Sequence, residues 1–492
     1  MSAPGGSVLV IDVGTSGVRA AIVRPDASLD HVQHRQILPK TPAAGIVEVD
    51  AGAIGAAAVE LAAGVLSQGG PVAGVGIANQ RATTVVWDRS TGQPVAPAIG
   101  WQDLRTVGTC LSLQADGLRL APNMAATKLA AILDAVDPDR ARAAELCFGT
   151  IDSWVAWTLS GGSLHVTDTT NAGVTGLVDP ATLRWDDRVL DLLGIPRSVL
   201  PEIVDSSGIV GEASALPGTP PIAGLCGDQQ ASLVGQGCTS EGKAKATFGT
   251  GGMLDLCTGW SRPATPTHGA SGTFSIVAWS RKGREAWGVE AVMLSAGTCV
   301  EWLRDDLGIL ESAEESSRVA ADCADPGDVW FVPALLGLGT PLWDFGARGT
   351  LLGITRGTGR AELVRAVLEG VAHRGADLLE AAEADSGMAV ETLRVDGGMS
   401  ANEVFVKALA DACGRPVEVS PILEATTLGA GFLAGMAVQT WRDEADAAAA
   451  YVPGRTVDPG VGDGDRLRRR ERWMEARSRA LESVPELSGI AF

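Results

Sequence analysis

The chain has 492 residues, which is too long for one hydrophobic core and indicates two domains. Hydrophobic residues make up 46% and charged residues 20% of it, and no uninterrupted apolar run reaches the length of about 18 residues that a membrane span needs. The 59 acidic residues outnumber the 39 basic ones, so the net charge is −20, which repels phosphate backbones. These totals argue against a nucleic acid or a membrane as partner.

The N-terminus and the cysteines bear on the compartment. The first residues, MSAPGGSVLVIDVG, lack the basic segment and the long apolar run of a signal peptide, so we expect a cytoplasmic enzyme. The eight cysteines are scattered, without a C-x-x-C pair or a nearby histidine cluster. They are expected to be buried reduced thiols rather than a disulfide framework or a zinc site.

Residues 8–23, VLVIDVGTSGVRAAIV, are two β-prone runs around a small polar centre and predict a β-hairpin. Backbone N–H groups converge in such a turn and can bind an anion, to which Thr15 and Ser16 add hydroxyl donors. Asp12 would repel phosphate itself, but it can hold Mg²⁺ through water. The alternative is an ordinary hairpin. A P-loop is excluded, because the chain has no G-x-x-x-x-G-K-[ST] sequence.

Strands and helices alternate through the rest of the first half, which predicts α/β layering. We expect strands near residues 31–40 and 71–80, an alanine-rich helix over 51–67, and mostly helices over 124–200. A proline-rich passage, ALPGTPPIAG, then interrupts the pattern. We place the domain boundary just after it, near residue 236.

The second half begins with a similar design. Residues 243–259, KAKATFGTGGMLDLCTG, again predict two strands around a glycine turn, which suggests two similarly built halves that face each other. A third glycine turn, residues 396–398, precedes a helix that starts near Asn402, where negative charge is favoured. A nucleotide held between two domains needs donors from both, so these turns make Thr250 and Gly398 candidate nucleotide contacts. An ordinary strand-to-helix turn is the alternative for the third turn.

Three further helices are predicted towards the C-terminus. Residues 363–383 form a helix of regular apolar spacing, and the alanine- and glycine-rich residues 425–438 form one suited to close packing. The last, RLRRRERWMEARSRA, is strongly basic, and we expect it to present a solvated charged face.

Three charged residues are candidates for chemistry. Asp228 follows a small apolar strand and precedes a helix, where a carboxylate can accept the proton of an alcohol that attacks a γ-phosphate. Capping of the helix is the alternative. The same two interpretations hold for Asp103 in GWQDLRT. Arg81 ends a strand, and it can either bind substrate hydroxyls or pair with a surface acid.

Six segments together closely resemble the FGGY carbohydrate kinases, specifically the glycerol kinase branch. In chain order they are IDVGTSGVRAAIV, GIANQRATTVVWDRSTGQPVAPAIGWQDLRT, GDQQASLVGQG, TFGTGG, GLGTPLWDFGARGTLLGITRG and RVDGGMSAN, and they cover nearly the whole chain. The resemblance implies an α/β fold of two actin-like domains of the ribonuclease H type, with ATP and Mg²⁺ in a nucleotide cleft between them. Residues 1–236 would be the sugar or polyol and phosphate side, and residues 237–492 the nucleotide side.

The resemblance also implies roles for individual residues. Asp12 is similar to the magnesium-side carboxylate, and Asp228 is similar to the catalytic base, also close to the metal. Around the transferring phosphate it places Thr15, Ser16 and Arg19. The implied nucleotide contacts are Thr250, Gly251, Gly297, Gly398, Asn402 and Glu301, the last of which stands where glycerol kinases usually have Gln.

The acceptor pocket departs from the family's pattern. The residues that agree with glycerol kinases are Arg81, Trp101, Asp228 and Gln229. Ala82 stands in place of a Glu, Asn123 in place of a Tyr and Met253 in place of a Phe. Each change removes bulk or a partner for a substrate hydroxyl, and Met is flexible where Phe is rigid. We therefore expect weak glycerol binding and room for a longer polyol or an open-chain ketose.

The main hypothesis is thus an ATP-dependent kinase that phosphorylates a terminal hydroxyl of a small polyol or open-chain sugar. One alternative is a true glycerol kinase that makes glycerol 3-phosphate. Another, from a different class, is an actin- or chaperone-like ATP-gated binding protein, which would have no use for the polyol-sized set of Arg81, Trp101, Asp228 and Gln229. The resemblance further implies a homo-oligomer, either a dimer or a tetramer.

Overall fold

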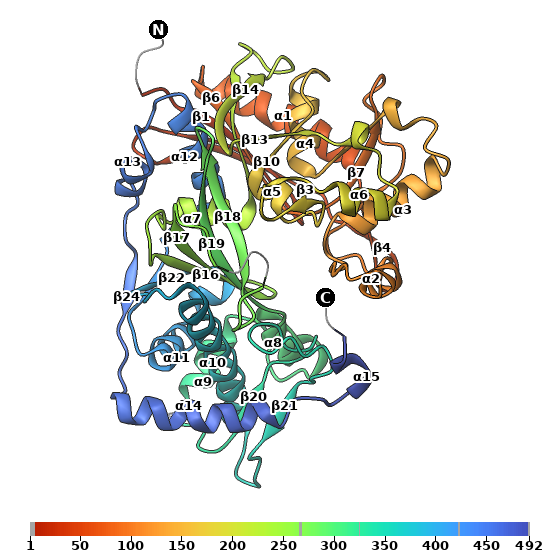
Figure 1. Cartoon of the computed structure of the whole chain (residues 1–492). Coiled ribbons are helices and arrows are strands. Elements are labelled where there is room, and N and C mark those ends of the chain that lie inside the picture. Colours follow the sequence, from red (N-terminus) through yellow and green to blue (C-terminus); the bar gives the residue numbers. More distant parts are fainter. Residues whose placement is uncertain (1–4, 265–267, 324, 422–423, 491–492) are drawn as a thin grey trace.

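The computed structural model describes residues 5–264, 268–323, 325–421 and 424–490. One 13-stranded sheet runs through the molecule in the order β24-β23-β22-β16-β17-β19-β18-β14-β15-β6-β1-β2-β3. Figure 1 shows the strands of the N-terminal half, in red to yellow, above those of the C-terminal half, in green to blue. The two groups of strands are joined by the pairing of β14 (Ser207–Glu212) with β18 (Phe274–Arg281).

Both halves contain the same five-stranded arrangement, in which a hairpin and a third antiparallel strand are followed by two parallel strands. In the N-terminal half these are β1 (Val8–Gly14), β2 (Gly17–Val23), β3 (Leu29–Gln36), β6 (Gly74–Asn79) and β15 (Pro221–Gly227). In the C-terminal half they are β16 (Ala244–Phe248), β17 (Gly252–Gly259), β19 (Arg284–Met293), β22 (Leu393–Asp396) and β23 (Val417–Val419). This repetition confirms the expected pair of similarly built α/β halves.

The remaining strands are short. Beyond the large sheet, whose last edge strand is β24 (Arg455–Val457), they form small sheets of two or three strands. These are β4 (Lys40–Ala43), β5 (Ile46–Val49), β7 (Val85–Asp88), β8 (Ala98–Ile99), β9 (Leu146–Gly149), β10 (Val166–Asp168), β11 (Val178–Asp179), β12 (Arg184–Trp185), β13 (Glu202–Val204), β20 (Trp330–Val332) and β21 (Thr350–Leu352).

Helices cover both halves, and those predicted at residues 51–67, 363–383 and 425–438 and near Asn402 begin within a few residues of the predicted positions. In the N-terminal half they are α1 (Ala51–Gly69), α2 (Val107–Gln114), α3 (Ala126–Val136), α4 (Ile151–Leu159), α5 (Thr169–Gly173), α6 (Asp187–Leu193) and α7 (Asp228–Gly235). In the C-terminal half they are α8 (Gly297–Glu301), α9 (Glu315–Ala321), α10 (Arg360–Ser386), α11 (Glu403–Cys413), α12 (Ala425–Ala437), α13 (Glu444–Ala449), α14 (Asp463–Ser478) and α15 (Pro485–Ser488). Residues 124–200 are less helical than expected, since four short strands, β9 to β12, interrupt them.

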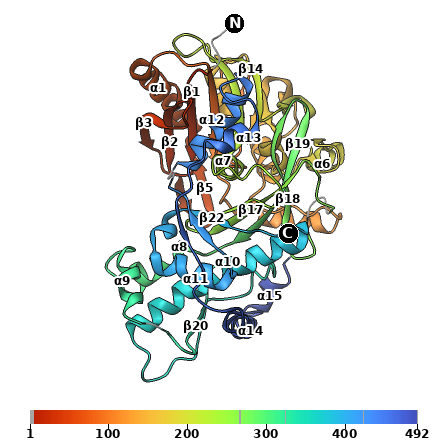
Figure 2. The ribbon, with the colours of Figure 1, turned by 90° about the vertical axis from the view of Figure 1, so that its left-hand side faces the viewer.

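Strand β1 lies between two layers and is buried on both faces. Leu9 and Ile11 pack into the core formed with α1, whereas Val8 and Val10 pack into the core formed with α12. Because side chains alternate along a strand, one apolar run supplies both layers. Figure 2 shows α1 and α12 on opposite sides of β1 and β2.

Helix α12 belongs to the C-terminal part of the sequence, but it packs against β1, β6, β14 and β15 of the N-terminal half. It also crosses α7 at very close range. A Cβ atom on Gly429 would lie 1.8 Å from the carbonyl oxygen of Ala231, and one on Gly235 would lie 1.9 Å from that of Ala425. The small residues are therefore required for contact between the two helices, as the composition of residues 425–438 predicted.

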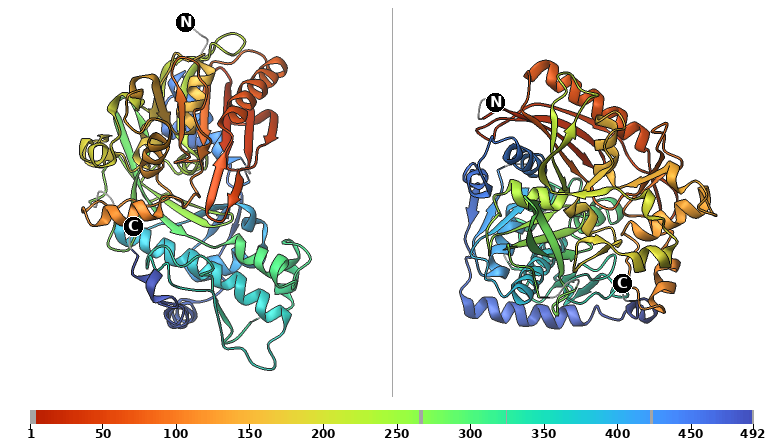
Figure 3. Two further views of the ribbon diagram at one scale, coloured as in Figure 1. Left: turned by 90° about the vertical axis from the view of Figure 1, so that its right-hand side faces the viewer. Right: turned by 45° about the horizontal axis from the view of Figure 1, so that its top comes forward.

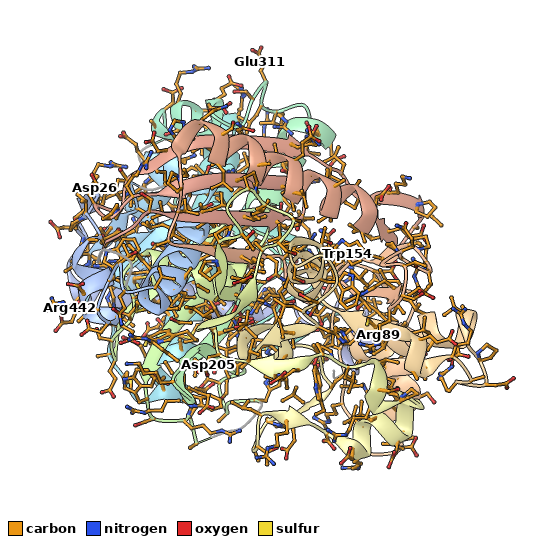
Figure 4. The ribbon with its side chains drawn as sticks, turned by 90° about the horizontal axis from the view of Figure 1, so that it is seen from above. Asp26, Arg89, Trp154, Asp205, Glu311 and Arg442 are labelled. Atoms are coloured by element: carbon orange, nitrogen blue, oxygen red, sulfur yellow. The ribbon has the colours of Figure 1, made fainter. Side chains whose placement is uncertain are left out.

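Helix α1 is long and apolar enough to cross a membrane, but half of its most apolar window is buried inside the protein. Asp50 caps its N-terminus, and Trp154 of α4 donates a hydrogen bond to the carbonyl of Ala51 at 2.7 Å. Trp154 is labelled in Figure 4. Figure 3 shows α1 along the outside of the N-terminal strands. It therefore packs as a core helix of the fold. All eight cysteines are buried free thiols, as expected.

The basic C-terminal helix α14 has the predicted solvated charged face and, opposite to it, a buried face. Arg470, Trp473 and Ala476 on one of its faces are buried, and only the other face is solvated. Arg470 pairs with Asp377 of α10 at 2.6 Å, and Trp473 donates to the same carboxylate at 3.1 Å. The prediction of a solvated charged face is confirmed for the outer side of the helix, whereas the buried stripe that meets an acid of α10 was not predicted.

Candidate functional site

The turn of the first hairpin consists of Thr15 and Ser16, since Gly14 pairs with Gly17 at the end of the ladder. A Cβ atom on Gly14 would meet nothing within 4 Å, so the backbone there borders open space. Gly17 has a different reason to lack a side chain, because its Cβ would lie 2.3 Å from the carbonyl oxygen of Arg35 in β3. Trp101 donates from Nε1 to Thr15 Oγ1 at 3.1 Å and so joins a predicted acceptor residue to the turn.

Asp12, near the end of β1, is almost completely buried. It accepts hydrogen bonds from Arg19 at 3.4 Å and from Thr427 of α12 at 3.1 Å, and Arg19 also forms an ion pair with Glu424. Burial raises the pKa of Asp12 to about 6, although Arg19 opposes this shift, and the negative charge of Asp228 raises the pKa further. The two predicted metal-side carboxylates are thus close enough to repel each other.

Asp228 is the first residue of α7, and Gly227 occupies the capping position. Its Oδ1 accepts from the backbone N–H of Gln229 at 2.8 Å, so it does not cap the helix in the usual way. Its side chain is 30% exposed. The surrounding protein raises the pKa of this carboxyl, and Arg81 lowers it. The structure therefore places a partly accessible carboxylate at the start of α7, a helix that contacts strands of both halves.

Arg81 follows β6 and is held by residues from both halves. One guanidinium nitrogen lies 2.8 Å from Glu290 of β19, and Nε lies 3.7 Å from Asp228. Its other terminal nitrogen lies 3.8 Å from the sulfur of Met253. The alternative of a surface ion pair is wrong, because the side chains of Arg81 and Glu290 are both buried. Glu290 was not among the predicted residues.

Ala82, beside Arg81, has a φ of 61° and a buried methyl group. A residue with a side chain adopts this left-handed conformation at a cost of about 1 kcal/mol. The position therefore belongs to a constrained turn next to Arg81, and the side chain there is as short as a chiral residue permits.

A row of buried charges crosses three neighbouring strands of the C-terminal sheet. Lys245 of β16 pairs in register with Asp255 of β17, which pairs with Glu290 of β19. Lys245 lies 2.8 Å from Asp255 and donates to Gln229 Oε1 at 2.7 Å. Burial raises the pKa of Asp255, and Lys245 lowers it. Sequence reasoning missed Lys245 and Asp255. A signal was present, since isolated charges within strands that are otherwise apolar are rare unless they are paired.

The turn of the second hairpin lies against the start of α8. Gly297 donates to the carbonyl of Gly249 at 2.8 Å, and Ala296 donates to that of Thr250 at 2.9 Å. A Cβ atom on Gly297 would lie 2.6 Å from the Gly249 oxygen, whereas one on Gly249 would meet nothing within 4 Å. These contacts bring together four predicted nucleotide residues, namely Thr250, Gly251, Gly297 and Glu301, the last on the exposed end of α8.

The third glycine turn follows β22. Asp396 accepts hydrogen bonds from Gln236 at 2.9 Å and from Ser232 at 3.1 Å, so the turn is tied to α7. A Cβ atom on Gly398 would meet nothing within 4 Å. Asn402 caps α11, accepting from Phe405 N–H at 3.0 Å, and its amide donates to Ser316 at 2.9 Å. The turn is therefore a strand-to-helix turn with open space at Gly398.

Two candidates lie apart from this group. Asp103 is completely buried and accepts hydrogen bonds from Arg105 and from the backbone N–H of Val47 at 2.6 Å. Burial would raise the pKa of Asp103, but these donors lower it, and its carboxylate links Arg105 to the backbone of Val47. Asn123 is exposed in the loop before α3, and within the described ranges no hydrogen bond or ion pair connects its side chain to the other predicted acceptor residues.

The duplicated strand arrangement, with a glycine turn at the tip of each hairpin and polar groups converging on α7, defines the class of two-domain, actin-like α/β proteins. The chain belongs to the FGGY family of carbohydrate kinases. The model of the family's N-terminal domain matches residues 7–235, and that of its C-terminal domain matches residues 244–438. The protein is therefore a carbohydrate kinase, a phosphotransferase with an alcohol group as acceptor. This assignment argues against an ATP-gated binding protein.

Individual relatives support the same assignment. The chain is 41% identical to a glycerol kinase of Dechloromonas aromatica, with 96% of this chain and 97% of that protein covered. It is also 41% identical to a glycerol kinase of Rhodopirellula baltica, with 98% and 92% covered. A crystal structure of Plasmodium falciparum glycerol kinase with ADP matches at a TM-score of 0.90 and 28% identity, with 96% and 98% covered.

Proposed function

We propose that the protein transfers the γ-phosphate of ATP to a terminal hydroxyl of glycerol. The observation that carries the proposal is the placement of Asp228 at the start of α7, with Arg81 and Gln229 beside it and Trp101 bound to the hairpin turn. The glycerol kinases that match nearly the whole chain support glycerol as the acceptor more strongly than they support an altered pocket.

The glycine turns fit the phosphates of ATP. Gly14, Gly249 and Gly398, one in each turn, all border open space, where a side chain would otherwise intrude. The proposed phosphate contacts are Thr15, Ser16 and Arg19, and the proposed nucleotide contacts are Thr250, Gly251, Gly297, Glu301, Gly398 and Asn402. The side chain of Asn402 is engaged as a helix cap, so its proposed contact is through the surface of the turn.

Asp12 and Asp228 fit a magnesium ion. The negative charge of Asp228 raises the pKa of Asp12, and a hard divalent cation would neutralise this pair of carboxylates. When bound, Mg²⁺ would offset negative charge on the transferring phosphoryl group. Asp228 also accepts the proton of the attacking hydroxyl, and its raised pKa brings it closer to that task.

The two halves would then bind different substrates. We propose residues 1–236 as the acceptor and phosphate domain and residues 237–492 as the nucleotide domain, although Met253 and Glu290 reach the acceptor side from the second. Closure of one half on the other would exclude water from the reaction. A cytoplasmic location and a homo-oligomer, dimer or tetramer, complete the proposal.

A longer polyol or an open-chain ketose is the second candidate acceptor. The carboxylate nearest to Arg81 is that of Glu290, and the sulfur of Met253 lies beside the same guanidinium group. Position 82 holds Ala, so no carboxylate there can bind a glycerol hydroxyl. The larger and more flexible surroundings favour a chain of four or five carbons.

An ADP-release assay over glycerol, tetritols, pentitols and ketoses tests both candidates. The highest kcat/KM on glycerol supports the first, and the highest on a four- or five-carbon acceptor supports the second. Asp228→Asn is the control for background hydrolysis. If no acceptor stimulates ADP release above this control, the proposed function is wrong.

A further inference from the structure

Lys245 is a completely buried ammonium group with three acceptors around it. Its Nζ lies 2.7 Å from Gln229 Oε1, 3.1 Å from Thr247 Oγ1 and 2.8 Å from Asp255 Oδ2. The contacts with Gln229 and Thr247 are hydrogen bonds, and the contact with Asp255 is an ion pair. The group is therefore held in one place by contacts from its own strand, from β17 and from α7.

The contact with Gln229 determines which way that amide faces. Lysine has no acceptor, so the atom of Gln229 that lies 2.7 Å from Nζ must be the oxygen. The NH₂ group of Gln229 then points away from Lys245 as a donor. Without such a partner, the two ends of a glutamine amide are nearly equal in size and can exchange.

The sheet itself does not need these charges. The opposite face of the same three strands is made of apolar residues such as Ala246, Leu254 and Ala291. A buried ion pair is often no more stabilising than a well-packed apolar pair of similar volume, because both ions lose their hydration. We therefore infer that Lys245 and Asp255 have a function besides stability. Outside the sheet, Lys245 contacts Gln229.

We propose that Lys245, anchored by Asp255, is a positioning residue that holds the Gln229 amide with its NH₂ group towards the acceptor. The inference rests on the proposed function, in which Gln229 binds the acceptor. Asp228 and Gln229 are neighbours in α7, and together they offer a hydroxyl group one hydrogen-bond acceptor and one donor. The carboxylate accepts the hydroxyl proton, and the amide donates to a hydroxyl oxygen.

The central variant replaces both charges, Lys245→Met together with Asp255→Leu, so that no buried charge is left alone. We expect its melting temperature to stay near that of the wild type and its KM for the acceptor to rise by about 5- to 10-fold, as for the loss of one oriented hydrogen bond. KM for ATP should stay unchanged. Lys243→Met is the matched control, since Lys243 is exposed in the same hairpin segment.

A double-mutant cycle with Gln229→Ala separates positioning from a structural role. If Lys245 acts through Gln229, the paired replacement should change the acceptor KM by less than about 2-fold once Gln229 has been truncated. Equal effects of the replacement with and without Gln229 would overturn the proposal, as would an unchanged acceptor KM in the paired variant itself.

Crystal structures of the unliganded wild type and of the paired variant give a result that does not depend on turnover. We expect the Gln229 oxygen on Lys245 in the wild type and a reoriented or dispersed amide in the variant. An amide in the same place in both would refute the positioning role. If the wild type phosphorylates no polyol but the amide still moves, the proposed function fails while the positioning by Lys245 stands.

Discussion

The guanidinium group of Arg81 lies 2.8 Å from the carboxylate of Glu290, and this ion pair joins the strand end after β6 to the sheet of the C-terminal half. Both side chains are about nine-tenths buried, with 11% and 9% of their surface exposed. An acceptor bound beside Arg81 would therefore meet a guanidinium whose direction is set by a residue from the other half of the chain.

Replacement of Glu290 by Ala should destabilise the protein by about 3 kcal/mol, because it leaves the buried guanidinium of Arg81 without its nearest counter-charge. It should also raise KM for the acceptor, since Arg81 is free to turn towards Asp228. Denaturant unfolding and steady-state kinetics measure the two effects. Glu285→Ala, in the more exposed part of β19, is the control and should change both by little. A stable Glu290→Ala enzyme with normal acceptor KM would show that the pair is dispensable.

Replacement of Asp228 by Asn should lower kcat by about 10²- to 10⁴-fold, which is the usual contribution of a general base. The amide has nearly the same shape and keeps an oxygen that accepts from the Gln229 N–H, so folding should be unaffected. Single-turnover phosphoryl transfer measures the loss, and circular dichroism checks the fold. A variant that keeps more than about a tenth of the wild-type kcat would contradict the assignment of the base.

Replacement of Gly14 by Ala should weaken ATP binding without loss of stability. The added methyl group meets no protein atom within 4 Å, so any effect reports on what occupies the open space. We expect KM for ATP to rise about 10-fold or more, as for a backbone that a phosphate can no longer approach. Gly462→Ala is the control, because its Cβ also meets nothing and it lies far along the chain. Equal ATP affinities of wild type, Gly14→Ala and Gly462→Ala would exclude this turn from the phosphate site.

His165 should contribute a loss of stability in mild acid. Burial among Trp87 and Trp157 lowers the pKa of His165 to about 4, and its Nε2 donates to the carbonyl of Phe148 at 2.7 Å. The unfolded chain takes up this proton near pH 6.5, so the stabilisation is complete above that pH and decreases as the pH falls towards about 4. The loss should reach at most about 3 kcal/mol.

Urea unfolding at a series of pH values measures this loss. Replacement of His165 by Gln should flatten the curve between pH 6.5 and 4, whereas His34→Gln, at an exposed position of β3, should leave it as in the wild type. An equally steep fall in the His165→Gln variant would assign the acid sensitivity to other groups.

Local pattern was sufficient for the hairpins and the helices. The β-prone runs on either side of residues 12–17 and 249–251 became β1–β2 and β16–β17, because a turn of small residues brings adjacent runs together without help from the rest of the chain. The spacing of apolar residues likewise predicted α10 and α12 to within a few residues. The family could be identified from motifs for the same reason, since each motif is a continuous segment.

Partners from distant segments could not be read from the sequence. Asp12 accepts a hydrogen bond from Thr427, which is 415 residues away, and Gln229 of α7 receives one from Lys245 of the next strand. Neither contact can be predicted from the spacing of residues in the sequence, because both contacts depend on how α7 and α12 cross. The charges inside β16 and β17 could have been noticed as anomalies, but the direction of their side chains depends on the register with β19.

The sequence by itself therefore determined the class of the protein, the two hairpin turns and the carboxylate at the start of α7, since each depends on neighbouring residues. Only the tertiary structure decided that Glu290 pairs with Arg81, that α12 returns to the N-terminal strands, and that α14 buries one face. The physical reason is common to all three. A buried charge needs a partner of opposite charge, and an apolar stripe needs other apolar residues to pack against. Which residue is that partner depends on how the whole chain folds.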